Sequence, residues 1–472
     1  MVRILVLVVT LASLAAVQGA VPQRSPAAAA HQHVDLDTLL QSLRAKLEAE
    51  QGAFSDRSPL PDSHKHIDVD AFLQKLRTSL EHKEGVASDR SPHPEVLERH
   101  PDIDLETPEL IQKYGYPVEE HFVTTADGYI LRMYRIPSSP KAKYPSKYPI
   151  LVMHGLESSA ADWVVMGPDK AFAYILADAG YDVWLGNARG NKYSRNHTTL
   201  NPDKSDFWQF SWHEIGYFDL PAMIDYILDQ TRRTDLFYAG HSQGTTSFYV
   251  MASTRSDYNA KIRVMFSLAP VAFMDNMASP LFQILAQFVE ILSVLTQLIG
   301  LNEFNPNNEF MQLVTELMCS DGAFTQDICS NLMFMIGGFN EAEMNKTMLP
   351  VILSHTPGGA SSKQFIHYGQ EIKSGHFRQY DFGAFGNLQK YGSLWPPDYD
   401  LSKITAKVVL LYSSNDWLAA VKDVNRLYEK LPNCIFKFLV EQETFNHLDF
   451  LWAIHAKELV YDYVLHIMAL NV

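Results

Sequence analysis

The chain has 472 residues, of which 47% are hydrophobic and 20% charged, a composition typical of a globular protein with a large core. Its formal net charge of −15 at pH 7 argues against nucleic acid or an anionic membrane surface as an electrostatic partner. We therefore expect a protein whose lipid contacts, if it makes any, are apolar.

The N-terminus has the features of a secretory signal. Arg3 precedes a short apolar run, and Val17 and Gly19 stand at the −3 and −1 positions of a cleavage site. The run is short for a membrane span, so no transmembrane segment is expected. We predict that residues 1–19 are a signal peptide and that the protein is secreted, with the lysosome as an alternative destination.

Cysteines and sequons fit the secretory route. Two N-x-T sequons, at Asn196 and Asn345, are predicted glycosylation sites. In an oxidising compartment Cys319 and Cys329, which close a ten-residue loop, are the natural disulfide pair. Cys434 lies in the apolar segment NCIFKFLV, where we expect a buried strand and a plain core thiol.

A 33-residue repeat marks the segment 20–102. HVDLDTLLQSLRAKL at His33 matches HIDVDAFLQKLRTSL at His66, and each unit predicts a short helix after an aspartate N-cap. Two such helices bury little apolar surface, so we predict a partly disordered N-terminal extension that acts as a propeptide or docking arm. Its HQH and HKH pairs are explained by inheritance of the repeat better than by a metal site, and no metal is expected.

From residue 103 to 472, strands alternate with helices. The turn Asp127-Gly128 predicts a hairpin. Later apolar runs are typical of parallel strands buried on both faces: YPILVMHGL, YDVWLGN, DLFYAGHS, RVMFSLAP and AKVVLLYSS. The alternation predicts an α/β fold with a mostly parallel, doubly wound sheet. It fails over about 271–398, where we predict an inserted helical cap over the sheet.

The motif GHSQG follows one of these strands and precedes helix-forming sequence. Gly240 and Gly244 are small where a strand turns sharply into a helix and neighbouring backbones pass close. This strand-turn-helix context predicts that Ser242 is a nucleophile. The role of His241 stays open.

A serine nucleophile needs a base and an orienting carboxylate, which follow it in this fold in the order acid, histidine. Asp416 follows the strand AKVVLLYSS, and His447 lies in TFNHLDF after the next strand, so both stand at strand ends. Asp381 remains an alternative acid. Asp449 is too near His447 in sequence to orient it well, and Asp423, in a helical stretch, is expected at the surface.

The oxyanion of a tetrahedral intermediate needs two N–H donors. The backbone of Gln243, directly after the nucleophile, is one. Leu156 is the predicted second donor, because Gly155 before it permits a tight path in the loop HGLESSAADW. His154 is expected to support this loop rather than act as a second base.

Blocks from Ile103 to the C-terminus resemble the acid lipase family of gastric lipase and lysosomal acid lipase. They include GYPVEEHFVTTADGYIL, WLGNARGNKYSRNH, FSWHEIGYFDLPA, GHSQGTT, SGHFRQYDFG and FNHLDFLW. The resemblance implies an α/β-hydrolase fold with a helical cap and lid, and hydrolysis of triacylglycerols or sterol esters without metal or cofactor. It matches the family's nucleophile, acid, base, oxyanion donors and cap disulfide to Ser242, Asp416, His447, Leu156, Gln243 and the pair Cys319 and Cys329.

The chain departs from the family pattern in its N-terminal extension and at Gly337, which replaces a third cap cysteine. The apolar segment 280–300 carries one narrow polar stripe, so it is either buried in the cap or a lid helix that meets a lipid–water interface. We expect a lipase acting on neutral lipid. The alternative is a catalytically idle homologue that stores or carries lipid. Oligomeric state and working pH are not predicted.

Overall fold

A computed structural model describes residues 100–143, 148–287, 302–304, 336–345 and 347–472, and the single positions 289, 293 and 296. The predicted signal peptide, almost all of the predicted N-terminal extension, and the predicted disulfide pair Cys319 and Cys329 lie outside the described residues. Most of the second half of segment 280–300 lies outside them too, so the choice between a buried and a lid helix there stays open.

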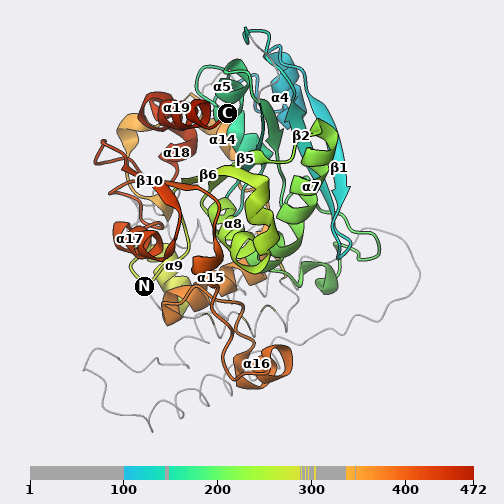
Figure 1. Ribbon diagram of the computed structural model, residues 1–472, viewed down its shortest axis with the longest axis vertical. Helices are drawn as coiled ribbons and strands as arrows, with labels where there is room; N and C mark the ends of the chain where they lie inside the picture. Colours follow the sequence, from blue (N-terminus) through green and yellow to red (C-terminus); the bar gives the residue numbers. More distant parts are fainter. Residues whose placement is uncertain are drawn as a thin grey trace, which may run out of the picture. The chain divides into compact units, whose positions relative to one another are not determined.

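An eight-stranded sheet, ordered β1-β2-β4-β3-β5-β6-β9-β10, forms the centre of the described part (Figure 1). The hairpin β1–β2 and the pair β2–β4 are antiparallel, and every other pair is parallel. The predicted mostly parallel α/β sheet is therefore confirmed. The strands are β1 Glu119–Thr124, β2 Ile130–Ile136, β3 Pro149–Met153, β4 Asp182–Leu185, β5 Leu236–His241, β6 Ile262–Leu268, β9 Val408–Tyr412 and β10 Cys434–Leu439.

The central strands are the predicted apolar runs. Every residue of β3, β4, β5 and β9 is buried, as expected of parallel strands covered on both faces. Their register aligns the C-terminal ends of neighbouring strands. Met153 of β3 pairs with Gly240 of β5, and Leu268 of β6 pairs with Leu411 of β9. The loops that leave β3, β5 and β9 therefore start along one edge of the sheet.

The prediction for β10 was wrong in one respect. This strand lies at the end of the sheet and pairs only with β9, so its side chains alternate irregularly between exposed and half-buried. Cys434 is half-buried rather than a core thiol. The apolar run could not reveal this, because it has the same composition as a central strand.

Helices connect the strands, and the core lies between them and the sheet. The connecting helices are α4 Thr107–Lys113, α5 Phe172–Asp178, α6 Trp212–Glu214, α7 Leu220–Thr231, α8 Gln243–Thr254, α17 Val421–Lys430, α18 Asp449–Trp452 and α19 Asp462–Leu470. In α7 the buried residues recur at helical spacing, which packs it against α8. On α5, Phe172 meets the ring of Tyr461, just before α19, at 4.6 Å.

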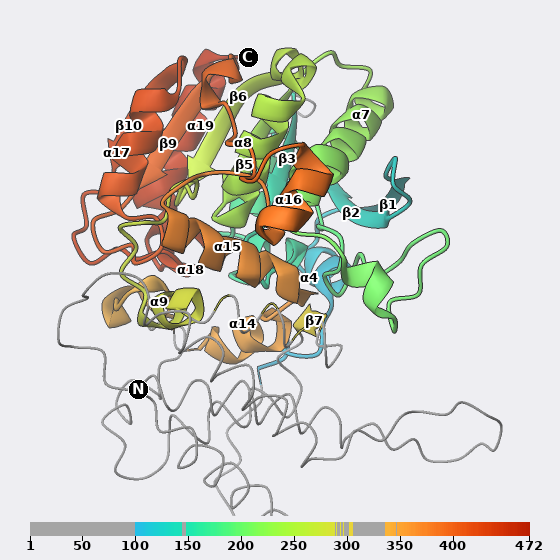
Figure 2. The same cartoon turned by 90° about the horizontal axis from the view of Figure 1, so that it is seen from below.

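Between β6 and β9 the described residues are mostly helical. They include α9 Pro280–Gln287, α14 Leu349–His355, α15 Ser362–Ser374 and α16 Gly383–Tyr391, and a short pair of strands, β7 Glu303–Phe304 and β8 Ala360–Ser361. Figure 2 shows α9, α14 and α15 on one side of the sheet, and Figure 1 shows α15 between α8 and α16. No described helix combines the length and hydropathy needed to cross a membrane.

A buried ion cluster fixes the loop after β4. The guanidinium of Arg189 has no exposed surface and donates to Asp127 at 2.6 and 2.8 Å and to Asp219 at 2.7 Å. It also lies 4.0 Å from the ring centre of Tyr129. Because a buried charge is tolerated only when it is paired and hydrogen-bonded, this cluster ties the hairpin turn, the loop after β4 and the start of α7 together.

Candidate active site

Ser242 stands on the turn between β5 and α8, with φ 52° and ψ −117°. A positive φ is strained for a residue with a side chain. The two flanking glycines explain how the turn fits. A Cβ on Gly240 would lie 2.7 Å from the carbonyl of Gly244, and a Cβ on Gly244 would lie 2.4 Å from the carbonyl oxygen of Met153. The motif therefore folds as the strained strand-to-helix elbow that the sequence predicted.

His447 and Asp416 form a buried pair. The Nδ1 of His447 lies 2.9 Å from both carboxylate oxygens of Asp416. Asp416 Oδ1 also accepts the backbone N–H groups of Leu418, at 2.9 Å, and Ala419, at 2.8 Å. The other ring nitrogen, Nε2, is buried and has no hydrogen-bond partner in the described part of the chain. The pair therefore leaves one imidazole nitrogen available for proton transfer.

The other carboxylates considered as acids have different partners. Asp381 accepts from Gly383 N and Asn387 Nδ2 beside α16. Asp449 accepts from Asn446 N at 2.8 Å and Asn340 Nδ2 at 2.7 Å. Asp423 is buried, contrary to the expectation of a surface position, because it accepts two hydrogen bonds from Asn276. Among the described residues, none of the three carboxylates is hydrogen-bonded to the imidazole of His447, which binds Asp416.

Gly337 and Gly338 join the acid loop to the histidine loop, and sequence reasoning missed this. The carbonyl oxygen of Gly337 accepts the N–H of Trp417 at 3.3 Å and that of His447 at 3.2 Å. Gly338 has φ 113°, and a Cβ there would lie 2.3 Å from the carbonyl oxygen of Asn415. The only signal was the glycine pair itself, at the place where the related family carries a cysteine.

His241, left without a role by the sequence, is a buried link between the nucleophile and the histidine loop. Its Nε2 lies 2.8 Å from the backbone carbonyl oxygen of His447, and the two rings lie 4.8 Å apart. A carbonyl only accepts, so Nε2 carries the hydrogen and donates. Burial, with the nearby His447 as a second cause, holds the pKa of His241 well below its usual range, so the ring stays neutral and is a weaker base than an ordinary histidine.

The loop after β3 packs directly on the elbow. A Cβ on Gly155 would lie 3.2 Å from Ser242 Cβ and 3.3 Å from His241 Nδ1, so a glycine fits closely here. Leu156, half-buried, follows in this loop. Gln243 is the first residue of α8, where a helix leaves its N–H groups without intrahelical acceptors. The backbone N–H groups of Leu156 and Gln243 donate no hydrogen bond to another described residue.

His154 supports this loop, as expected. Its Nδ1 lies 2.8 Å from the carbonyl oxygen of Gly155, and its Nε2 accepts the backbone N–H of Ala188 at 3.1 Å. Burial lowers the pKa of His154 to about 4, so it stays neutral near neutral pH.

The sequence did not predict a contact between Gln364 of α15 and Gln243. Gln364 Oε1 accepts from the side chain of Gln243 at 2.6 Å and thereby connects α15 to the residue after the nucleophile.

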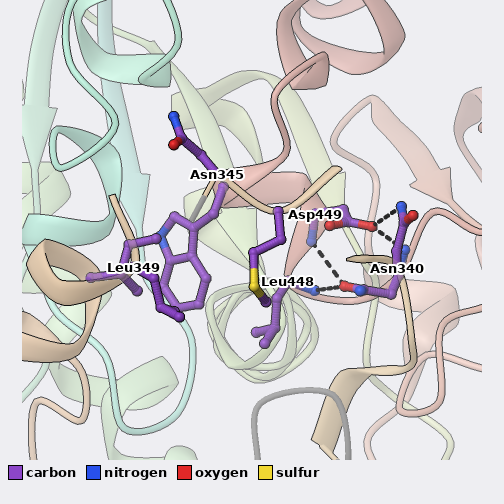
Figure 3. Close-up of a pocket in the computed structure, with 9 residues that line it drawn as sticks. Asn340, Asn345, Leu349, Leu448 and Asp449 are labelled. Carbon is purple, nitrogen blue, oxygen red and sulfur yellow. Dashed lines mark hydrogen bonds between the residues drawn. The ribbon is translucent and has the colours of Figure 1, made fainter. Parts of the chain in front are cut away.

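A small cavity of about 30 Å³ lies behind the histidine loop, with room for a water molecule rather than a substrate. Figure 3 shows Asn340 and Asp449 hydrogen-bonded to each other on one side of it, with Asn345 and Leu349 on the other. Burial, the largest cause, raises the pKa of Asp449 to about 7.

The two predicted glycosylation sites differ: Asn196 is exposed, whereas Asn345 is half-buried and its Oδ1 accepts from Thr347 N and Met348 N.

Comparisons with known proteins place the chain. The family model of the α/β hydrolase fold matches residues 148–454, and that of the partial α/β-hydrolase lipase region matches residues 107–167. Lipase 3 of Drosophila melanogaster is 46% identical over 358 residues, which cover 76% of this chain and 91% of that protein. This chain belongs to the α/β-hydrolase lipases. Gastric triacylglycerol lipase of Bos taurus is also similar, with 38% identity over 377 residues that cover 79% of this chain and 93% of that protein.

Membership in this lipase family confirms two predictions made from the sequence. The fold is that of the α/β hydrolases, and the protein is an ester hydrolase of the lipase class related to gastric lipase. Both family matches fall within residues 107–454 and so do not extend into the repeats of the N-terminal segment.

Proposed function

We propose that this lipase is secreted and hydrolyses carboxylic esters of neutral lipids, triacylglycerols or sterol esters, through a Ser242–His447–Asp416 acyl-enzyme mechanism. The proposal rests most heavily on one observation. The buried imidazole of His447 is hydrogen-bonded to Asp416 through Nδ1, and its Nε2 has no described partner. Its backbone carbonyl is hydrogen-bonded to His241, and the residue after His241 is Ser242, whose φ is positive. A relative that shares 38% identity is named a triacylglycerol lipase, which supports neutral esters as substrates.

In the first half of the reaction, Ser242 Oγ attacks the ester carbonyl carbon and its proton passes to His447 Nε2. The carbonyl π electrons move to the oxygen, and the resulting oxyanion accepts the N–H groups of Leu156 and Gln243. The positive end of the α8 dipole adds to this stabilisation. When the intermediate collapses, the C–O bond to the alcohol breaks, and the leaving oxygen takes the proton from Nε2. The products are the free alcohol and an acyl ester on Ser242.

In the second half, water replaces the serine as the nucleophile. His447 Nε2 takes a proton from water, the hydroxyl oxygen attacks the acyl carbon, and the same two N–H groups receive the oxyanion. Collapse returns the proton to Ser242 Oγ and releases the fatty acid. Asp416 keeps the hydrogen of His447 on Nδ1, so that Nε2 has the lone pair, and it stabilises the imidazolium in both halves.

The hydroxyl of Ser242 is not hydrogen-bonded to His447 Nε2 in this structure. Such contacts are often long without substrate and tighten when the reacting atoms are in place. We therefore expect the contact between Ser242 Oγ and His447 Nε2 to form when the ester is bound. Two features support secretion and glycosylation: the signal-like residues 1–19, and exposed Asn196 in its sequon.

The test is hydrolysis by the full-length protein, secreted from a eukaryotic host. We expect it to release fatty acid from emulsified triacylglycerol, and we expect Ser242→Ala to lower the rate by about 10⁴-fold or more. An idle storage or carrier homologue would instead give the same negligible rate for the wild type and the variant across pH 4 to 9.

A further inference from the structure

A segment with α16 at its centre holds large apolar side chains in solvent. Phe385 is 82% exposed and Trp395 is 68% exposed. Phe382, Leu388 and Leu394 are exposed in the same segment, and we call these five side chains the α16 patch. Exposed apolar residues are ordinarily scattered singly, so five within 14 residues of sequence mark an interaction site.

Hydrogen bonds hold the segment that carries the α16 patch in a defined conformation. At its base, Gln379 N donates to Pro397 O, and Tyr399 N donates to Phe377 O, both at 3.0 Å. Inside the segment, the buried side chain of Asn387 connects both ends. It accepts from Phe382 N at 2.9 Å and donates to Leu394 O at 3.1 Å.

Helical spacing places part of the patch on one stripe. Phe385 and Leu388 are three residues apart, which sets them on the same side of α16, and Phe382 directly precedes the helix. Trp395 and Leu394 follow the turn at Gly392, where φ is 70°. Figure 1 shows α16 beyond α15, at the opposite end of the described part from α19.

The charge of this segment identifies the kind of surface that it fits. Residues 382–397 contain a single charged residue, Lys390, although a fifth of the whole chain is charged and the net charge is −15. Within residues 381–398 the acidic side chains are Asp381 and Asp398, at the base; outside the segment, Glu214 lines a cavity with Phe382 and Lys390. A carboxylate is costly to remove from water, so its absence from residues 382–397 suits contact with apolar lipid. Trp and Phe rings beside a cation, with no acid among them, are the composition of protein surfaces that enter the boundary layer of a lipid aggregate.

The patch is also close to the candidate active site. Lys363 of α15 lies with its ammonium 4.9 Å from the ring centre of Phe382 and 4.7 Å from that of Tyr380. Its neighbour Gln364 accepts the hydrogen bond from Gln243, the residue after Ser242. The helix α15 therefore connects Phe382 of the patch to the residue that follows Ser242.

We propose that the α16 patch docks this protein on the surface of a neutral-lipid droplet, with Phe385 and Trp395 as the main anchors. This inference rests on the proposed function, since it assigns the surface by which that active site meets its aggregated substrate. It places the contact on α16, a different element from the apolar segment 280–300.

The test separates docking from chemistry. Two proteins are floated with triolein droplets coated with phosphatidylcholine. One carries Ser242→Ala alone, and the other carries Ser242→Ala together with Phe385→Ser/Trp395→Ser. Removing two large aromatic anchors is expected to lower the bound fraction by about tenfold or more. The matched control is Phe436→Ser/Leu470→Ser, which removes exposed apolar groups on β10 and α19; Leu470 is 72% exposed. This control is expected to float as its parent does.

The hydrolysis rates of the two double variants are then measured with Ser242 intact and compared with the rate of the wild type. Loss of the patch is expected to slow hydrolysis of emulsified triolein and to leave hydrolysis of a dissolved p-nitrophenyl butyrate within about twofold. Unchanged flotation, or an equal loss in the control, overturns the proposal, as does a patch variant that instead dissociates an oligomer in sedimentation. If the dissolved ester is not cleaved even by the wild type, the proposed chemistry fails while flotation still reports on docking.

Discussion

The imidazole of His241 donates a hydrogen bond to the backbone carbonyl of His447, from Nε2 at 2.8 Å, although 206 residues separate them in sequence. His241 is the residue before Ser242, so one side chain fixes the distance between the strained elbow and the loop of the proposed base. Its second nitrogen, Nδ1, is buried without a described hydrogen-bond partner and faces Gly155. The loop after β3, the Ser242 elbow and the His447 loop therefore all contact one neutral ring.

The first prediction concerns this contact. His241→Phe keeps an aromatic ring but removes the donor, which frees the His447 loop to shift. We expect kcat on a dissolved ester to fall by about 10- to 100-fold with little change in KM, because small misplacements of a catalytic group act on the chemical step. His241→Gln, whose Nε2 hydrogens reach a similar place, is expected to recover part of the rate. Equal loss in both variants would contradict a positioning role.

A second prediction concerns Gly338, which lies between the acid and histidine loops. Its φ of 113° and the carbonyl of Asn415, 2.3 Å from a Cβ placed there, leave no room for alanine. We expect Gly338→Ala to lower both the melting temperature and kcat, since Asn415 precedes Asp416. Gly115→Ala is the matched control, because that glycine also has positive φ, 82°, but nothing within 4 Å of its Cβ. The control is expected to lose some stability and keep kcat.

The buried cluster around Arg189 gives a prediction about stability. Arg189→Met leaves the carboxylates of Asp127 and Asp219 without their cation in a buried site. Breaking a buried pair in this way is expected to lower the free energy of unfolding by about 3–5 kcal/mol. Arg195→Met, which removes a half-exposed pair with Glu303, is expected to change it by less than about 1 kcal/mol. Denaturant unfolding measures both, and similar values would show that burial does not set the difference.

Two of the buried carboxyls with raised pKa values give a prediction about the pH dependence of stability. Burial raises the pKa of Asp162 to about 6 and that of Asp449 to about 7, above the values in an unfolded chain. Between about pH 4 and 7 the folded protein therefore holds more protons than the unfolded one. Their contribution to stability is complete below about pH 4 and is lost as pH rises through 6 and 7. Asp162→Asn/Asp449→Asn, which stays neutral, is expected to flatten the fall in melting temperature between pH 5 and 8, and an unchanged slope would contradict the assignment.

The sequence was sufficient for the parts of the fold that obey local rules. Alternating apolar runs and helices predicted the parallel sheet, and glycines on both sides of Ser242 predicted the elbow, because each depends on spacing within a few residues. Edge position does not leave such a signal, so β10 and Cys434 were misjudged. Asp423 was misjudged for a related reason: its burial depends on Asn276, which is remote in sequence.

The supporting contacts of the candidate site were beyond sequence reasoning. The carbonyl of Gly337, the side chain of Gln364 and the ring of His241 act through partners that only the fold brings near. Backbone acceptors in particular leave no trace in residue type. The motif thus predicts which side chains carry the chemistry, a prediction that the labelling experiment below tests, but it does not predict the contacts that hold them.

The most direct test of the account is covalent labelling at the proposed nucleophile. The wild type is incubated with a fluorophosphonate and digested, and the modified peptide is located by mass spectrometry. We predict one adduct, on Ser242, its formation slowed strongly in His447→Ala and absent in Ser242→Ala. A folded wild-type protein that takes no label, or that takes it at another serine while Ser242→Ala retains hydrolysis, would contradict the central claim.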